Sequence, residues 1–119
     1  MSQKKREGGR RSGPSRQDVE RLLRLYQLGE LERAERLAEA LTSSYPDHQM
    51  SWKILGAVQV SRKKKSLANI AFTKAVEIDP NKSQAYFYRG YSKYELKNHK
   101  GAIDDFIKVL EIDPNYESV

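Results

Sequence analysis

The sequence predicts an all-α fold, an α-solenoid built from three helix-turn-helix hairpins and therefore six helices. Two observations predict it. The segment Glu-Ile-Asp-Pro-Asn at residues 77–81 recurs at residues 111–115, which is 34 residues later. Between such segments, apolar residues recur at the spacing of amphipathic helices. A unit of this length cannot bury its apolar face alone, so successive units are expected to stack into a solenoid.

The individual helices follow from the apolar spacing and from the residues that stop them. In the middle unit, Ile54, Leu55 and Val58 lie at helical spacing. Pro80 ends the second helix of this unit because proline cannot continue a helix, and Asn81 is expected to cap the next helix. We therefore expect helices at residues 17–28, 31–44, 49–61, 65–78, 82–96 and 100–112.

Glycine lies in the middle of two of these predicted helices, as Gly56 and Gly90. Glycine costs ~1 kcal/mol relative to alanine in a helix interior, so a close approach of a neighbouring helix is expected there. Ala68 and Ala102, near the start of the second helices, are expected to present the small partner surface. Trp52 would fill the space between the two helices of its hairpin.

These residues carry a resemblance to the tetratricopeptide repeat (TPR) family. Residues 49–82 and 83–116 resemble TPR repeats closely, and residues 15–48 resemble one more distantly. The family's signature positions hold Trp52, Leu55, Gly56, Ala68, Phe72, Ala75 and Pro80, then Tyr86, Gly90, Ala102, Phe106 and Pro114. The resemblance implies a right-handed superhelix whose concave side is lined by the first helix of each hairpin. The first unit also resembles the N-terminal TPR arrays of bacterial glycosyltransferase- and sulfotransferase-type proteins.

The positive charge of the chain is concentrated at its start. The net charge is +6, and residues 1–16 contribute six Lys or Arg against one Glu. Residues 1–14 contain glycine and proline and, after Met1, no large apolar residue, so we expect a disordered basic tail. The predicted organisation is this tail, a TPR domain at residues 15–116 with repeats 15–48, 49–82 and 83–116, and a C-terminal end at residues 117–119.

The resemblance places the binding surface in the concave groove. The expected partner-binding residues are Tyr26, Met50, Lys53, Phe87, Tyr88, Tyr91 and Tyr94. Phe87, Tyr91 and Tyr94 share a helix face at spacings i, i+4 and i+7, and tyrosine is an effective anchor at recognition surfaces. The alternative is that these rings simply pack against the next hairpin.

One known TPR ligand is the acidic C-terminal EEVD peptide of heat-shock chaperones, which requires a clamp of Lys and Asn side chains around two carboxylates. The corresponding positions here are Val19, Leu23, Ile54, Gln84 and Tyr88. None of them is Lys, Arg or Asn. A register shifted by one repeat gives Lys53, Ala57 and Tyr88, of which only Lys53 fits, so we predict that the chain does not bind an EEVD tail.

A basic run, Arg62-Lys63-Lys64-Lys65, lies in the turn of the middle hairpin. It is a candidate anion-binding site, and together with the basic tail it would give weak nucleic-acid binding. The alternative is a solvated turn, which we favour because the run is short and has no interleaved aromatic residues. Nucleic acid is therefore an unlikely partner.

Nothing in the sequence predicts catalysis, a cofactor or a metal site. His48 and His99 are the only histidines, and neither has a second ligand at metal-binding spacing. Asp104 and Asp105 are adjacent and so do not face each other on a helix. There is no cysteine and no phosphate-binding glycine loop. We therefore expect a protein that is not an enzyme.

The predicted last hairpin has an apolar face with nothing in the sequence to cover it, formed by some of Tyr91, Phe106, Ile107 and Leu110. Either the chain is part of a longer array, or a second copy or partner covers this face. Self-association through this hairpin is one expected outcome.

Three functions remain after these exclusions. The leading one is a protein-protein interaction scaffold that binds a peptide or partner helix in the concave groove. The alternatives are a non-catalytic docking segment of a larger glycosyltransferase- or sulfotransferase-type enzyme, and weak anion binding by the tail and residues 62–65. We expect a cytoplasmic protein with no membrane span, because no stretch approaches ~20 apolar residues.

Overall fold

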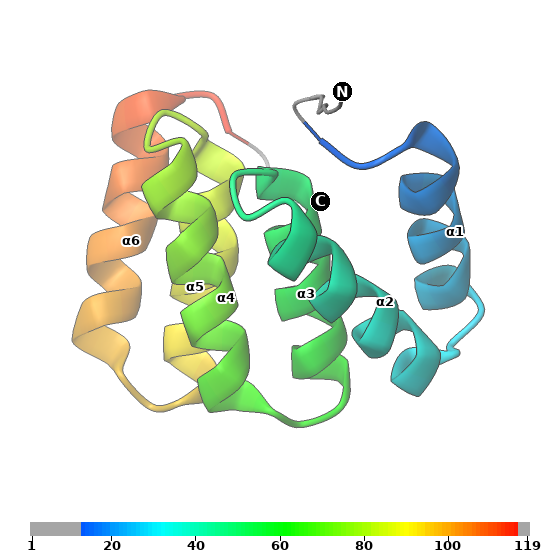
Figure 1. Cartoon of the computed structure of the whole chain (residues 1–119). Helices are drawn as coiled ribbons and strands as arrows, with labels where there is room; N and C mark the ends of the chain where they lie inside the picture. The colour runs from blue at the N-terminus through cyan, green and yellow to red at the C-terminus, as the bar shows by residue number, and fades with distance from the viewer. Residues whose placement is uncertain (1–12, 117–119) are drawn as a thin grey trace.

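A computed structural model describes residues 13–116, and within this range the chain forms six helices arranged as three successive hairpins (Figure 1). The helices are α1 (Arg16–Gln27), α2 (Leu31–Ser44), α3 (Gln49–Ser61), α4 (Lys65–Ile78), α5 (Ser83–Glu95) and α6 (His99–Ile112). Each bound lies within one residue of its sequence prediction. The predicted disordered tail, apart from residues 13 and 14, and the C-terminal end lie outside the described residues.

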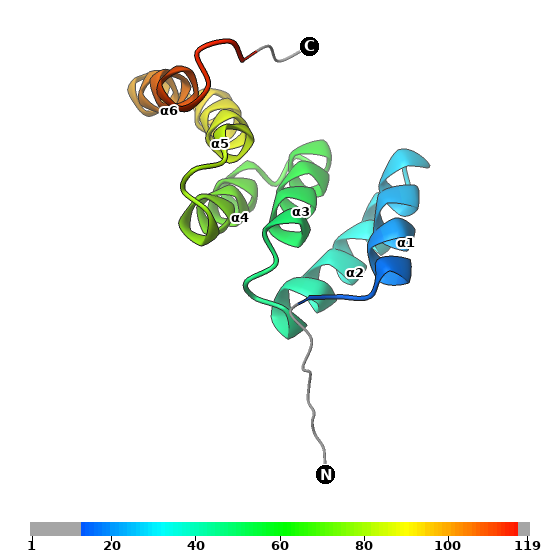
Figure 2. The ribbon, with the colours of Figure 1, turned by 90° about the horizontal axis from the view of Figure 1, so that it is seen from above.

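The hairpins stack side by side into a curved row. Figure 2 shows α1, α3 and α5 along one side of the curve and α2, α4 and α6 along the other. This is the all-α solenoid that the sequence predicts. Within residues 13–116, no helix has the length and hydropathy that a membrane crossing requires.

Each hairpin turns at a residue with a positive φ angle, and these residues are 34 positions apart. The angles are 77° at Gly29, 65° at Lys63 and 70° at Lys97. The residue after each one donates its backbone N–H to a carbonyl five residues earlier, over distances of 2.8 to 2.9 Å. This is the pattern of a helix end with a left-handed residue, where glycine is preferred. Two lysines therefore occupy positions that are strained for an L-amino acid.

The entry into α5 differs from the prediction. The residue that precedes α5 is Lys82, and it makes no side-chain capping bond. Asn81 lies one residue earlier, in a turn where its backbone N–H donates to Asp79 Oδ1 over 3.1 Å. The prediction that Asn81 caps α5 was therefore wrong, because Asp79 organises this turn through its own carboxylate.

The ring of Phe72 packs so closely against α3 that only glycine fits at position 56. A Cβ atom on Gly56 would lie 2.5 Å from Cε1 of Phe72, and its three nearest atoms all belong to that ring. The small partner surface expected at Ala68 is thus not what approaches the glycine most closely. The Phe72 ring also stacks on Tyr88 of α5, with ring centroids 5.6 Å apart, and so joins the second hairpin to the third.

The third hairpin contains a buried ion pair that the sequence did not reveal. Asp105 of α6 is only 3% exposed. Arg89 of α5 donates to its two oxygens from Nε and Nη2, over 2.9 and 2.8 Å. Lys93 lies 3.3 Å from the same carboxylate. The hydrogen bond to Asp105 raises the pKa of Arg89 despite partial burial. Arg89 is itself partly buried, and its charge is neutralised by this pairing.

Candidate functional site: the concave groove

The first helices of the three hairpins line a hollow of about 290 Å³ on the concave side. Its lining is mostly apolar and consists of Leu23, Tyr26, Met50, Lys53, Ile54, Ala57, Gln84 and Tyr88. Residues from α1, α3 and α5 thus converge on one surface, because every first helix faces the inside of the curve (Figure 2).

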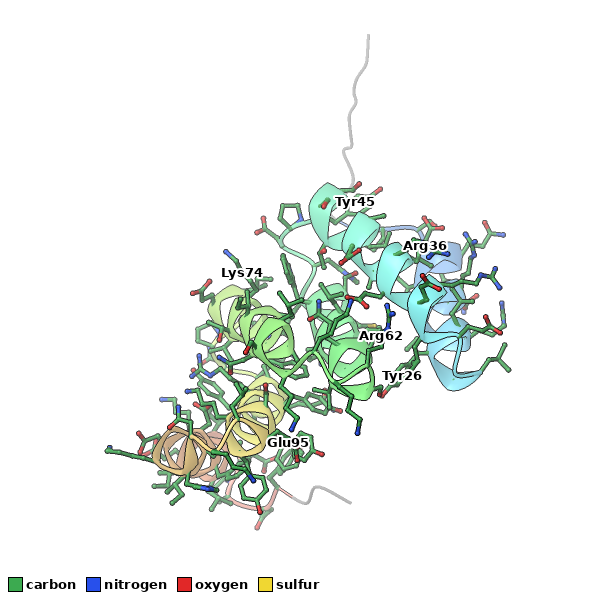
Figure 3. The ribbon with its side chains drawn as sticks, turned by 90° about the horizontal axis from the view of Figure 1, so that it is seen from below. Tyr26, Arg36, Tyr45, Arg62, Lys74 and Glu95 are labelled. Atoms are coloured by element: carbon green, nitrogen blue, oxygen red, sulfur yellow. The ribbon has the colours of Figure 1, made fainter. Side chains whose placement is uncertain are left out.

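A second hollow, of about 250 Å³, continues this surface toward the C-terminal end of α3. It is lined by Tyr26, Ala57, Val60, Ser61, Phe72, Tyr88 and Tyr91. Tyr26, Ala57 and Tyr88 belong to both hollows, so the two form one continuous surface along α3. We call this surface the concave groove. Figure 3 shows the side chain of Tyr26, from α1, in the space between α1 and α3.

The groove contains one cationic side chain, that of Lys53. Its ammonium donates to Oε1 of Gln84 over 2.7 Å. Burial lowers the pKa of Lys53, and the nearby charge of Lys82 lowers it further. Among residues 13–116, no carboxylate lines either hollow. A mostly apolar surface with one cation can hold an apolar segment and fix its position through one charged contact.

The structure brings together five of the seven residues predicted for partner binding. Those that line the groove are Tyr26, Met50, Lys53, Tyr88 and Tyr91. Tyr91 and Met50 are each 43% exposed, so a ligand in the groove can reach both.

Phe87 and Tyr94 lie elsewhere. The Phe87 ring packs against the rings of Phe106 and Tyr116, at centroid distances of 5.8 and 5.7 Å. Phe87 therefore packs against the final part of the third unit. Tyr94 meets His99 edge to face, at 5.4 Å, beside the turn between α5 and α6. The three aromatic residues predicted to share one face of α5 therefore lie in three places. Tyr91 lines the groove, Phe87 packs on Phe106 and Tyr116, and Tyr94 lies beside the turn before α6.

Phe72 is a groove residue that the sequence prediction missed. It comes from the second helix of its hairpin, yet it lines the groove between α3 and α5. Gly56 makes this possible, because the absence of its side chain leaves room for the ring. The pairing of a mid-helix glycine with a phenylalanine 16 residues later was the available signal, and it recurs as Gly90 and Phe106.

The basic run at residues 62–65 is largely neutralised by carboxylates. Arg62 and Lys64 both bind Glu35 of α2, at 2.7 and 3.1 Å, and Lys65 lies 3.7 Å from Glu95. Figure 3 shows Arg62 and Glu95 on the ribbon. Burial opposes ionisation of Glu35, but hydrogen bonds from Lys64 and Arg62 prevail and lower its pKa. Within residues 13–116, only Lys63 of this run has no carboxylate partner. The geometry therefore gives the predicted anion site little free charge.

His48 has a structural role that the sequence analysis missed. It precedes α3, and its Nδ1 accepts a hydrogen bond from the backbone N–H of Ser51 over 3.3 Å. Burial lowers the pKa of His48, which favours the neutral ring needed for this cap. Across residues 13–116, no group of three or more His, Asp or Glu side chains is placed to hold a metal ion.

Comparison with known protein families identifies the repeats. One tetratricopeptide repeat model matches residues 83–116, and another matches residues 20–83. The chain belongs to the tetratricopeptide repeat family. A search of curated proteins found no match.

Solved TPR structures share this fold. The first TPR of Spaghetti (RPAP3), bound to the HSP90 peptide SRMEEVD, matches with a TM-score of 0.80 at 20% identity over 88% of this chain and 86% of that one. The Yersinia enterocolitica chaperone SycD, in complex with a YopD peptide, matches with a TM-score of 0.80 at 18% identity, over 83% of this chain and 76% of that one.

MamA from Desulfovibrio magneticus RS-1 matches with a TM-score of 0.78 at 22% identity. The match covers 85% of this chain but only 57% of the MamA chain. This chain therefore spans little more than half the length of that solved MamA chain. At these identities, the similarities establish the TPR fold and not a shared ligand.

Proposed function

We propose that this TPR domain is a protein-protein interaction scaffold that binds a peptide or helix of a partner in the concave groove. The observation that carries the proposal is the continuous apolar groove along α3, which presents exposed Met50 and Tyr91. Exposed apolar residues gathered in a concave surface are typical of a binding site. Two of the similar structures contain bound peptides, which supports the proposal.

We propose that the ligand is not an EEVD tail, although RPAP3 was solved with such a peptide. Two adjacent carboxylates need more than one cation, and within the described residues 13–116 Lys53 is the only cation that lines the groove. The second carboxylate would be left unpaired beside an apolar surface, which is costly. A peptide ending in EEVD should therefore bind no better than the same peptide with its final aspartate replaced by asparagine and its C-terminus amidated.

The domain itself is proposed to be non-catalytic, as TPR domains typically are, and to act without a cofactor. The resemblance of the first unit to arrays of glycosyltransferase- and sulfotransferase-type proteins stays a prediction, as does a cytoplasmic location. Weak nucleic-acid binding is the least supported alternative, because Arg62, Lys64 and Lys65 are already paired with carboxylates.

A display library of random linear peptides tests the groove. The parent chain should enrich peptides, and a Met50→Ala, Tyr91→Ala variant should bind the enriched peptides at least about tenfold more weakly, because two exposed anchors are removed. A matched control is Leu67→Ala, Ile70→Ala, which alters two exposed apolar residues of α4 outside the groove. No enrichment, or an equal loss in both variants, would overturn the proposal.

A further inference from the structure

Lys53 differs from every other partly buried cation of the described chain. Within residues 13–116, six Lys or Arg residues are partly buried, and they are Lys53, Arg62, Lys64, Lys65, Arg89 and Lys93. Five of them lie within 4.0 Å of a carboxylate, Glu35, Glu95 or Asp105. Lys53 has no such partner among these residues. Its one side-chain hydrogen bond goes to the neutral amide of Gln84.

An ammonium in this position is unfavourable while the groove is empty. An ammonium carries three N–H donors, and Gln84 accepts one of them. Among residues 13–116, no other side chain accepts a hydrogen bond from this ammonium, and the adjacent Met50, Ile54 and Ala57 carry no acceptor on their side chains. The burial that lowers the pKa of Lys53 reflects the same cost. A carboxylate brought into the groove would form a charge-assisted hydrogen bond and remove that cost.

We propose that the segment bound in the groove presents one aspartate or glutamate side chain to Lys53, with apolar residues on both sides of it. The inference rests on the proposed function and names its ligand chemistry. One carboxylate is expected because the groove offers one cation. An internal side chain is expected, rather than a chain terminus, because apolar surface extends in both directions from Lys53, toward Met50 and toward Val60.

The length of the groove sets the spacing in the ligand. Val60 follows Lys53 by seven residues on α3, which corresponds to about 10 Å along the helix axis. An extended peptide advances roughly 3.3 Å per residue, so about three residues span that distance. The ligand should therefore have an apolar residue three positions from its acidic residue. That apolar side chain would enter the hollow formed by Val60, Tyr88 and Tyr91.

The test uses the peptides enriched from the random library and their twins in which the acidic residue is replaced by glutamine. For the parent chain, each acidic peptide should bind about tenfold more tightly than its glutamine twin. Lys53→Met keeps an unbranched apolar stem without the charge, and for this variant the two twins should bind equally. The control Lys74→Met removes an exposed cation of α4 outside the groove and should retain the tenfold difference.

Lys53→Gln serves as a second variant if Lys53→Met does not give the helical circular dichroism spectrum of the parent. The affinity of the acidic peptide should also fall as salt is raised, while that of its twin should not. Enriched peptides that lack an acidic residue, or twins that bind the parent equally, would overturn this inference and leave the groove function intact. No enrichment at all would overturn both.

Discussion

Replacement of Gly56 with alanine should destabilise the chain, although the same change on an open helix surface is stabilising. The added Cβ would lie 2.5, 2.7 and 2.8 Å from three atoms of the Phe72 ring. Carbon atoms normally pack at ~3.5–4.0 Å, so the overlap is about 1 Å. The ring cannot move outward easily, because Phe72 is 1% exposed and stacks on Tyr88.

The expected size follows from two opposing contributions. Overpacking of a tight core costs about 1–3 kcal/mol, and the better helix propensity of alanine offsets up to about 1 kcal/mol of that. We therefore expect Gly56→Ala to lower the free energy of unfolding by about 1–2 kcal/mol. Addition of Phe72→Leu should relieve the overlap, so the double variant should lose less than the sum of the two single changes.

Urea denaturation checks this prediction with two probes. Circular dichroism at helical wavelengths follows all three hairpins, and fluorescence of Trp52, the only tryptophan, follows the middle one. Gly90→Ala is the matched control, because its Cβ would lie 2.7 Å from the ring of Phe106, which is partly exposed and can shift. Its loss should be smaller. A Gly56→Ala chain as stable as the parent would refute the packing argument.

Three further predictions concern stability and assembly. Lys63→Gly should raise the free energy of unfolding by about 1 kcal/mol in urea denaturation, because φ at this residue is 65°, whereas Gly29→Ala should lower it by a similar amount. The pKa of His48 is lowered in the folded chain, so its contribution to stability should be complete above about pH 6.5 and decline as the pH falls. In thermal unfolding at a series of pH values, His48→Asn should remove that part of the pH dependence, since asparagine caps without titrating. Light scattering should show self-association of the parent chain. Ile107, on α6, is 49% exposed, and Ile107→Lys should reduce this self-association. A parent chain that is monomeric at all concentrations would contradict this expectation.

The helices could be predicted because the same pattern of apolar and helix-ending residues recurs in the repeats with a period of 34 residues. Pro80 and Pro114 fix where the second helices end, and the period of 34 residues transfers these limits to the first unit. The positions of the hairpin turns were predicted, but their positive φ angles were not. Lysine rarely adopts a left-handed conformation, so Lys63 and Lys97 give no indication of it in the sequence. The apolar spacing and the prolines therefore predict the helices, while the positive φ angles come from the hydrogen bonds that close each hairpin turn.

The groove was predicted less completely, for reasons that involve distant parts of the chain. Tyr91 and Phe87 are four residues apart on α5, yet Phe87 is covered by Phe106 and Tyr116 while Tyr91 is open. A helical spacing cannot tell which of its neighbours another element will cover. Buried charges were missed for a related reason, since Glu35 is 27 residues from Arg62 and reads in the sequence as a surface residue.

The ion pairs between Glu35 and the turn of the second hairpin make the order of the repeats matter for stability. Glu35 belongs to the first hairpin, and Arg62 and Lys64 belong to the second. The residue that corresponds to Glu35 one period later is Asn69, which carries no charge. If the second hairpin were duplicated in tandem, the basic turn of the copy would meet an amide instead of a carboxylate. The units are therefore not interchangeable, and recombination that altered their order would leave two partly buried cations without a carboxylate.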